Sequence, residues 1–331
     1  MTARCNLRCP HCYSATFSGR GELTFEEARR LIEGAAELRT QQFAFTGGEP
    51  LLRSDLFELL RYAVELGLTP HIVTNGILLS ESAAQQLARL DIYTIVSVDG
   101  ASPATHERMR GEGTWKRVHE GIQRLRKAGV EFCTVMTITS YNYGEAAPYL
   151  CHAMELGATH AAYIPAIPSG RALRNTWLLP SSDQVLKAAY AIQEAAEETG
   201  YYAAIWCSPF LNAFISFDRV FVGGCGRDGL DIDPEGNVLL CDVLDIRITS
   251  IRDRSVVDAW REFLAHPLVN ELEAPSRLQA PCRTCPHRDS CGGGCVARSL
   301  FAFNNLFGPD PLCPIVAEWL QRRSSAEQRN A

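Results

Sequence analysis

The stretch Cys5-Asn-Leu-Arg-Cys9-Pro-His-Cys12-Tyr13 decides how the rest of this 331-residue chain is interpreted. Its three cysteines are spaced C-x3-C-x2-C, so one short loop carries three thiols. Three thiolates can hold three irons of a cubane [4Fe–4S] cluster and leave the fourth iron without a protein ligand. An iron with a free position is suited to chemistry, whereas a fully ligated cluster mostly carries electrons. A zinc loop with His11 as fourth ligand is disfavoured, because this ring cannot easily reach a metal held by its direct neighbour.

A second group of seven cysteines lies near the C-terminus: Cys225, Cys241, Cys282, Cys285, Cys291, Cys295 and Cys313. Seven thiols are too many for one cluster and suit two, so the sequence predicts accessory clusters in this region. Two zinc ribbons are the alternative. Cys133 and Cys151 fall within a predicted strand and a predicted helix, where we expect them to be small core residues.

The composition indicates a globular protein that binds neither nucleic acid nor membrane. Apolar residues make up 46% and charged residues 21% of the chain, and no apolar run approaches the ~20 residues that cross a bilayer. The net charge of −6, without a block of Lys and Arg, disfavours a nucleic-acid backbone as partner. No secretory signal precedes the cysteines, so they indicate metal ligands rather than disulfides, and we expect a cytoplasmic location. Only four residues precede Cys5, so either the chain starts upstream or the fold lacks its first strand.

Helical stretches alternate with short β-rich runs between residues 24 and 165. A capping box at Thr24-Phe-Glu-Glu27 opens the first helix. We predict strands at 42–46, 70–73, 93–98, 132–138 and 160–164, with helices from 24, from 54 and at 80–90, 115–128 and 144–156. This βα repetition predicts an α/β fold in which a parallel sheet curls into an open or partial barrel, with active residues at the C-terminal strand ends. The alternation stops beyond residue 200, where a region rich in cysteine, glycine and proline begins.

The N-terminal cysteine trio resembles the signature of the radical S-adenosylmethionine (SAM) superfamily. This resemblance implies that Cys5, Cys9 and Cys12 hold the reactive cluster and that His11 packs near the adenine of the cofactor. It also implies a partial (β/α)6 TIM-like barrel at residues 1–175, a bridging helix at 176–200 and a cysteine-rich iron–sulfur domain at 201–331.

Three strand ends resemble the cofactor-binding segments of the same superfamily. Thr46-Gly47-Gly48-Glu49-Pro50 follows a predicted strand, and its glycines would let a ligand approach the backbone. In the family this segment holds the amino group of the methionine moiety. The other two strand ends, Thr74-Asn75-Gly76 and Ser97-Val98-Asp99-Gly100, resemble segments that approach the ribose and methionine ends of the cofactor. The candidate cofactor contacts are therefore His11, Gly47, Gly48, Glu49, Thr74, Asn75, Ser97 and Asp99. For Asp99 an Asx turn before Gly100 is an equal alternative.

Two arginines resemble family positions less specifically. Arg108 matches a position after the strand at 93–98, with a surface salt bridge as the alternative. Arg171 lies in a segment predicted to be a linker, and it either contacts carboxylates of substrate or cofactor or belongs to a hinge.

The C-terminal cysteines resemble, spacing for spacing, the SPASM domain with its two auxiliary clusters. The family pattern implies one cluster on Cys225, Cys241 and Cys295, with a hairpin turn at Gly236. It implies a second cluster on Cys282, Cys285, Cys291 and Cys313. The first set lacks a fourth ligand, for which Cys207 is the candidate; an open iron and ordinary burial of Cys207 are the alternatives.

The resemblance implies an enzyme, a radical SAM oxidoreductase or maturase without catalytic side chains beyond the cluster ligands. S-adenosylmethionine would be cleaved reductively to a 5′-deoxyadenosyl radical, which abstracts hydrogen from the substrate. The chain's end resembles the mycofactocin and pyrroloquinoline-quinone peptide maturases, and also the enzymes that modify haem. We favour a peptide or protein side chain as substrate over a tetrapyrrole. Expected partners are an electron donor such as flavodoxin or ferredoxin and a separate leader-peptide-binding protein. A non-catalytic electron-transfer protein is disfavoured, because it would not use Gly47-Gly48-Glu49.

Overall fold

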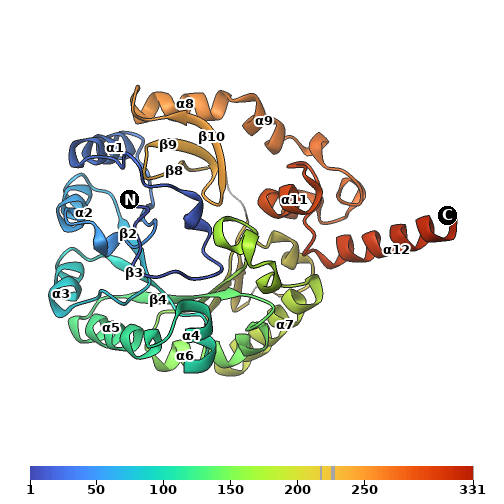
Figure 1. Cartoon of the computed structure of the whole chain (residues 1–331), viewed down its shortest axis with the longest axis horizontal. Coiled ribbons are helices and arrows are strands. Elements are labelled where there is room, and N and C mark those ends of the chain that lie inside the picture. Colours follow the sequence, from blue (N-terminus) through green and yellow to red (C-terminus); the bar gives the residue numbers. More distant parts are fainter. Residues whose placement is uncertain (217, 225–227, 331) are drawn as a thin grey trace.

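The computed structural model describes residues 1–216, 218–224 and 228–330. Its centre is a parallel sheet of seven strands that follow one another in sequence order and curve around a central space (Figure 1). The strands are β1 (Phe43–Phe45), β2 (Pro70–Thr74), β3 (Tyr93–Ser97), β4 (Phe132–Ile138), β5 (Ala161–Pro165), β6 (Ala203–Ile205) and β7 (Val220–Val222). The predicted α/β fold with a barrel-like sheet is therefore confirmed.

Helices cover the outer face of this sheet (Figure 1). They are α1 (Phe25–Glu37), α2 (Leu56–Glu65), α3 (Glu81–Arg89), α5 (Thr114–Ala128), α6 (Ala146–Glu155) and α7 (Ser182–Thr199). The capping box predicted at Thr24 and Glu27 is present, and a second one starts α7 at Ser181 and Gln184. A further helix, α4 (Pro103–Arg110), lies between β3 and α5; the sequence analysis did not predict it.

The main core lies between the sheet and these outer helices. Phe45, Ile72 and Leu59 have no exposed surface, and they pack together with residues from the other strands and helices. The burial of β2 alternates along the strand, whereas six of the seven residues of β4 are buried. Such continuous burial is expected for a parallel strand in the middle of a sheet, covered on both faces.

The sheet continues past residue 200, which corrects the prediction that its strands end there. Strand β6 pairs in parallel with β5, and β7 pairs in parallel with β6. Each has only three residues, too few for a period-two pattern to be recognised. At the other edge, Thr2 forms a parallel bridge with Gly47, so the few residues before Cys5 extend the sheet without forming a complete strand.

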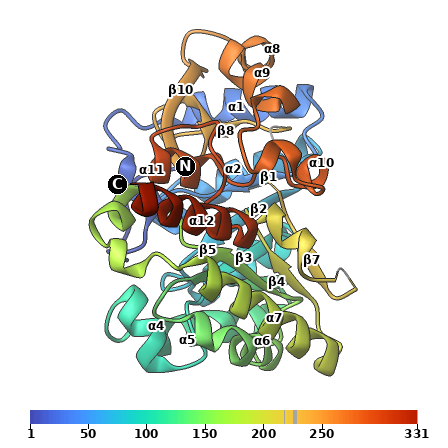
Figure 2. The same cartoon turned by 90° about the vertical axis from the view of Figure 1, so that its right-hand side faces the viewer.

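The C-terminal region adds a small antiparallel sheet and short helices. Strands β8 (Asp231–Ile232), β9 (Asn237–Cys241) and β10 (Leu244–Ser250) lie against the open side of the large sheet, near α1 (Figures 1 and 2). The predicted turn at Gly236 joins β8 to β9, with a φ of +85° that favours glycine. The helices are α8 (Val256–Ala265), α9 (Pro267–Glu273), α10 (Arg288–Cys291), α11 (Val296–Phe303) and α12 (Pro314–Asn330).

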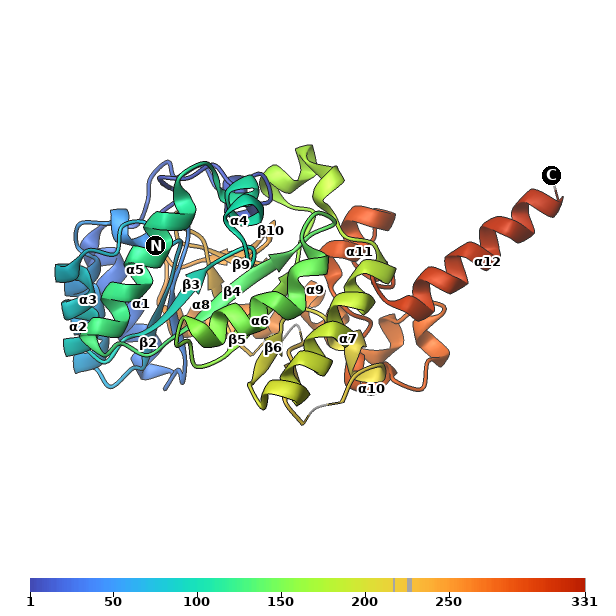
Figure 3. The same ribbon diagram turned by 90° about the horizontal axis from the view of Figure 1, so that it is seen from below.

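Short 3-10 helices connect many of these elements. They are η1 (Tyr13–Thr16), η2 (Pro50–Leu52), η3 (Tyr143–Glu145), η4 (Gly170–Arg174), η5 (Thr176–Leu178), η6 (Pro209–Ala213), η7 (Pro275–Arg277) and η8 (Cys282–Thr284). Helix α12 projects away from the rest of the molecule (Figure 3). Among the described residues, no helix combines the length and the apolar character needed to span a membrane.

A buried ion pair organises the C-terminal region. The guanidinium of Arg298, on α11, contacts the carboxylate of Asp310 at 2.7 Å, and both side chains are almost fully buried. The same carboxylate accepts hydrogen bonds from the backbone N–H groups of Cys295 and Leu312, at 2.9 and 3.0 Å. Asp310 thus holds the start of α11 and the segment before α12 in one place.

Replacing Asp310 with alanine should therefore destabilise this region strongly. It would leave the Arg298 charge buried and unpaired, which typically costs about 3–5 kcal/mol. We expect a lower thermal unfolding midpoint and loss of iron from the cluster-loaded protein. Asp183→Ala is the matched control, because Asp183 forms only an exposed pair with Lys187 and should change neither quantity appreciably. Equal behaviour of the two variants would contradict this role of Asp310.

Candidate functional site

The loop of residues 5–12 brings its three cysteines near one another. The backbone N–H of Cys12 donates to the carbonyl of Cys9 at 3.2 Å, so the chain turns between these two ligands. Cys9 is buried, Cys12 is half-buried and Cys5 is exposed, and none of them forms a disulfide. Burial, with smaller contributions from Asp99, Cys12 and Cys5, raises the pKa of the Cys9 thiol to about 11 against the opposing charge of Arg110. Three neighbouring thiols on one loop fit the donor set of a cluster with one open iron.

The segment after β5 clamps this loop, although the sequence indicated a linker there. Arg171 donates from its backbone N–H to the carbonyl of Cys12 at 2.9 Å and from Nε to the carbonyl of Cys9 at 2.8 Å. Asn175 donates to the carbonyl of Pro10 at 3.2 Å. A Cβ atom at Gly170 would lie 2.5 Å from the carbonyl oxygen of Cys12, so only glycine fits this approach. Arg171 is thus a positioning residue of the cysteine loop.

Gly47 and Gly48 are required by the close approach of the N-terminal segment. Gly48 donates its N–H to the carbonyl of Thr2 at 2.6 Å, and a Cβ atom at Gly48 would lie 2.2 Å from the carbonyl oxygen of Arg4. A Cβ atom at Gly47 would lie 2.4 Å from the carbonyl oxygen of Thr2. The packing of the N-terminal segment therefore requires both glycines, a reason that the sequence did not indicate.

Glu49 ties the ends of β1 and β2 together. Its carboxylate is fully buried, and it accepts hydrogen bonds from the Thr74 hydroxyl at 2.7 Å and from the Asn75 backbone N–H at 2.8 Å. Burial raises the pKa of Glu49 above its usual value, while these donors oppose the shift. The Asn75 side chain donates to Asn6 at 2.8 Å and lies 3.8 Å from the sulfur of Cys5. Asn75, at the end of β2, thus meets the cysteine loop directly, and Glu49, after β1, holds the backbone of Asn75.

Asp99 is the centre of a buried charge cluster. One carboxylate oxygen lies 2.7 Å from Arg110 Nε and 3.2 Å from His11 Nε2, and the other accepts from the Thr137 N–H at 2.7 Å. Burial would raise the pKa of Asp99, but Arg110 and His11 outweigh it and hold that pKa below its usual value. Burial lowers the pKa of His11 to about 4, so His11 is neutral at pH 7. Asp99 therefore acts as the counter-ion of Arg110 rather than as the cap of an Asx turn.

Arg110, and not Arg108, is the arginine that reaches this site. Arg110 is nearly buried and lies close enough to Cys9 and Cys12 for these thiols to raise its pKa. Arg108 instead stacks over the ring of Trp177, 5.4 Å from its centroid. His106 and Arg110 are one helical turn apart on α4, and His106 Nδ1 accepts the Asp99 N–H at 3.2 Å. Had α4 been predicted as a helix, the four-residue spacing would have placed Arg110 on the same face as His106.

One ring nitrogen of His11, Nδ1, is buried and has no protein partner among the described residues. Ser97 ends β3 and is half-buried, two residues before Asp99. An unpaired ring nitrogen beside the cysteine loop is compatible with the predicted place of His11 near the adenine, which stays a prediction.

Two of the three cysteines predicted to hold the first accessory cluster are described, and they lie near each other. Cys241 ends β9, Cys295 precedes α11, and both belong to one apolar cluster that also contacts Cys207. Arg298 donates to the carbonyl of Cys207 at 2.5 Å and lies near Cys295, whose proximity raises its pKa. Cys225, the remaining predicted ligand, lies outside the described residues.

The four cysteines of the second predicted accessory cluster line one pocket. These are Cys282, Cys285, Cys291 and Cys313, and Asp310 and Phe210 line the same pocket. Burial raises the pKa of Cys282 to about 11 and of Cys291 to about 12, with neighbouring thiols adding to both shifts. Four thiols converging on a pocket match the donor set of a fully ligated cluster.

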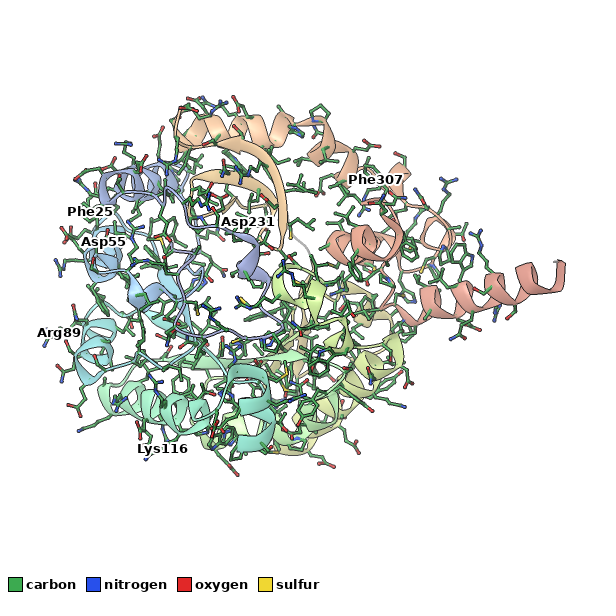
Figure 4. All side chains as sticks on the ribbon, viewed as in Figure 1. Phe25, Asp55, Arg89, Lys116, Asp231 and Phe307 are labelled. Carbon is green, nitrogen blue, oxygen red and sulfur yellow. The ribbon has the colours of Figure 1, made fainter. Side chains whose placement is uncertain are left out.

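Two aspartates that the sequence analysis missed lie between the cysteine loop and Cys241. Ligand atoms of Asp231, Cys241 and Asp242 all fall within 4.8 Å of one another, and the Tyr13 hydroxyl hydrogen-bonds to Asp242. Desolvation and the neighbouring carboxylate of Asp242 together raise the pKa of Asp231 to about 7, although the residue keeps an exposed surface. Asp231 lies inside the curve of the sheet, whereas labelled residues such as Arg89 lie on the outer rim (Figure 4). Asp231 and Asp242 lie on the two arms of the hairpin predicted around Gly236, and the Asp242 backbone N–H donates to the Asp231 carboxylate at 3.0 Å.

Residues 1–146 match the Radical SAM superfamily. The chain thus carries a radical SAM domain and is an enzyme, as the cysteine trio and the strand ends led us to expect. A domain of this family implies S-adenosylmethionine and a [4Fe–4S] cluster as cofactors.

Proteins with two different names resemble the whole chain. The AdoMet-dependent heme synthase of Methanosarcina barkeri is 29% identical over 335 residues, covering 95% of this chain and 94% of that protein. The PqqA peptide cyclase of Xanthomonas axonopodis pv. citri is 28% identical over 341 residues, covering 100% and 90%. Among solved structures, anSMEcpe with bound AdoMet and Cp18Cys peptide has a TM-score of 0.75 at 20% identity, covering 97% of this chain and 93% of that one. SuiB of Streptococcus suis bound to S-adenosylmethionine has a TM-score of 0.76 at 17% identity, covering 95% and 75%.

Asp99→Asn tests the buried charge cluster. Without the negative charge, Arg110 loses its counter-ion and His11 loses the partner that orients it. We expect S-adenosylmethionine to bind about ten- to a hundredfold more weakly, as when residues supporting direct ligands are changed elsewhere. Equilibrium binding to the cluster-loaded protein measures this loss, with Asp91→Asn, a change at an exposed aspartate, as the control. Unchanged affinity in Asp99→Asn would show that the charge cluster only stabilises the fold.

Cys207→Ala tests the fourth ligand of the first accessory cluster. A ligating thiolate sets the potential of its cluster, so the variant should shift that cluster's EPR signal and lose iron. Cys133→Ala, at a buried cysteine of β4, should leave the signal unchanged. An unchanged spectrum and iron content in Cys207→Ala would favour an iron open to substrate.

Proposed function

We propose that this enzyme cleaves S-adenosylmethionine reductively and abstracts a hydrogen atom from a peptide or protein side chain, as the maturase of a ribosomal peptide or a peptide-derived cofactor. The observation that carries this proposal is the cysteine loop itself, bonded to strand ends through Asn75 and clamped by Arg171. When bound there, the cluster and S-adenosylmethionine supply a 5′-deoxyadenosyl radical, which makes the enzyme an oxidoreductase.

The chain's own residues would hold and orient the two cofactors. Cys5, Cys9 and Cys12 would ligate the cluster, and the clamp from Arg171 fixes the loop that carries them. His11, neutral and held by Asp99, would present its free Nδ1 to the nucleoside. Because Asp99 already orients His11 and the carbonyl of Cys9 already holds Arg171, little reorganisation of these two side chains would be needed.

A peptide substrate is supported by the names of relatives and by the polar groups of the site. The PqqA peptide cyclase aligns with the full chain, and the fold matches structures bound to the Cp18Cys peptide and to the precursor peptide SuiA. Tyr13, which follows the cysteine loop, is hydrogen-bonded to Asp242, and Asp231 lies beside it, so these two carboxylates would bind a peptide amide or a side-chain hydroxyl.

Two accessory [4Fe–4S] clusters complete the proposal. Cys282, Cys285, Cys291 and Cys313 would hold one of them, in the pocket that they share. Cys225, Cys241 and Cys295 would hold the other, with Cys207 as the fourth ligand. These clusters would take up the electron that the oxidised substrate releases, and a flavodoxin or ferredoxin would supply the electron for cofactor cleavage. A separate protein would bind the leader peptide.

Oxidative modification of a haem or another tetrapyrrole side chain is the second candidate function. It is supported by the heme synthase of Methanosarcina barkeri, which aligns with 95% of this chain at 29% identity.

Cofactor cleavage under strictly anaerobic conditions tests the proposed chemistry. The reconstituted protein should hold about twelve irons in three clusters and release 5′-deoxyadenosine when dithionite is added. The variant with alanine at positions 5, 9 and 12 should release none, whereas Cys282→Ala with Cys285→Ala should retain cleavage without substrate turnover. Stoichiometric zinc with little iron, or cleavage by the triple variant, would refute this assignment. Mass loss from a candidate peptide rather than from a tetrapyrrole then separates the two candidate substrates.

A further inference from the structure

Large apolar side chains are exposed on the segment that clamps the cysteine loop. Leu173 on η4 and Trp177 on η5 are 49% and 50% exposed. Tyr141, after β4, is 48% exposed, and its neighbour Ser140 donates from Oγ to the Trp177 carbonyl at 2.5 Å, so the two loops lie side by side. Exposed apolar side chains that gather on one face of a protein mark an interaction site.

Two arginines stand among these apolar side chains. The guanidinium of Arg108, on α4, lies over the Trp177 ring, 5.4 Å from its centroid, and Arg174 is exposed directly after Leu173. Neither arginine forms an ion pair with a described residue. We call this surface the arginine–aromatic face; it consists of Arg108, Tyr141, Leu173, Arg174 and Trp177.

The arginine–aromatic face covers the cysteine loop. Arg171 and Asn175, on the same segment, hold the carbonyls of Cys9, Cys12 and Pro10 by hydrogen bonds of 2.8, 2.9 and 3.2 Å. The segment at 170–178 therefore contacts the loop and also meets solvent. In Figure 3, α4 and this lime-green segment lie on the same side of the sheet. A partner bound to the face would be separated from the cysteine loop only by this short segment.

We propose that the arginine–aromatic face is the docking surface for an acidic electron-transfer protein of the flavodoxin type, which reduces the cluster of the cysteine loop. This inference rests on the proposed function, which requires such an electron. The anionic hydroquinone of the flavin would give one electron to the cluster and become the neutral semiquinone, so no proton is transferred. Arginine, tryptophan and tyrosine are enriched in protein interfaces, and complexes that transfer electrons bury little surface, which suits a small face.

The charge of the face favours an acidic partner. The whole chain carries a net charge of −6 at pH 7, so an acidic protein is repelled on average. Behind the face, the half-buried Arg171 has no carboxylate partner among the described residues. On α4, Glu107 is engaged, because it accepts the Trp115 N–H at 3.2 Å, and Glu112 is the exposed acid that follows this helix. The face is therefore locally positive, and it would steer an acidic partner toward the cysteine loop.

The cover over the loop favours an electron donor rather than a substrate. A substrate has to contact the cofactor that attacks it, and the backbone of residues 170–178 stands between the face and the cysteine loop. An electron can pass through such a segment, because transfer requires a short distance and no contact between donor and acceptor. The partner of this face can therefore remain outside the barrel.

Binding of flavodoxin to the anaerobic, cluster-loaded protein tests the docking surface. We expect Arg108→Glu combined with Arg174→Glu to weaken the equilibrium affinity at least about tenfold. The matched control is Arg61→Glu combined with Arg89→Glu, which makes the same charge change at exposed positions of α2 and α3; Arg89 lies on the outer rim in Figure 4. With the unaltered protein, the affinity should fall as salt is added, because salt screens the charges. Equal affinities of the two double variants, or an affinity that salt does not change, would overturn the proposal.

Release of 5′-deoxyadenosine with two different reductants provides a second measurement. Dithionite is small and needs no docking surface, so the variant changed at positions 108 and 174 should retain release with dithionite and lose most of it with reduced flavodoxin. Equal loss with both reductants would show that the face supports the cysteine loop instead, and the proposal would fail. Absence of release from the unaltered protein with dithionite would refute the proposed function, and the binding measurement would still decide whether flavodoxin docks on this face.

Discussion

The cysteine loop has no regular secondary structure between residues 5 and 12, so its shape depends on hydrogen bonds from other parts of the chain. Three of these come from the segment after β5, more than 150 residues later, through Arg171 and Asn175. A fourth joins Asn6 to Asn75 at the end of β2. The loop can therefore reach its final shape only after the parallel sheet has formed, because the sheet brings these donors to one end of the barrel.

The sequence was sufficient to predict the elements whose signals are local. Helix α1 follows its capping box at Thr24, and β2 to β5 fall where short apolar runs indicated strands. Strands β6 and β7 were missed because three residues carry no periodicity. Helix α4 was missed because its polar sequence lacks an apolar stripe, since it buries His106 and Thr105 rather than a row of aliphatic side chains.

The same distinction between local signals and long-range packing applies to the candidate site. The resemblance to the SPASM pattern grouped the four thiols that the structure brings to one pocket. Residue roles that depend on long-range packing could not be read in this way. Gly48 is fixed by the backbone of Arg4, and Asp99 is fixed by Arg110, a contact that requires the orientation of α4. The cysteine pattern predicts which thiols meet, whereas the partners of charged side chains such as Asp99 depend on the finished fold.

The Arg298–Asp310 pair stands between the two groups of accessory cysteines, and this position couples them. Asp310 lines the pocket of Cys282 and also binds the backbone of Cys295, while Arg298 binds the backbone of Cys207. A change in either group thus reaches the other through two adjacent buried charges. Insertion of iron at one group of cysteines would order the other group. Loading of the two accessory clusters is therefore expected to be cooperative, with few molecules that hold only one of them during assembly.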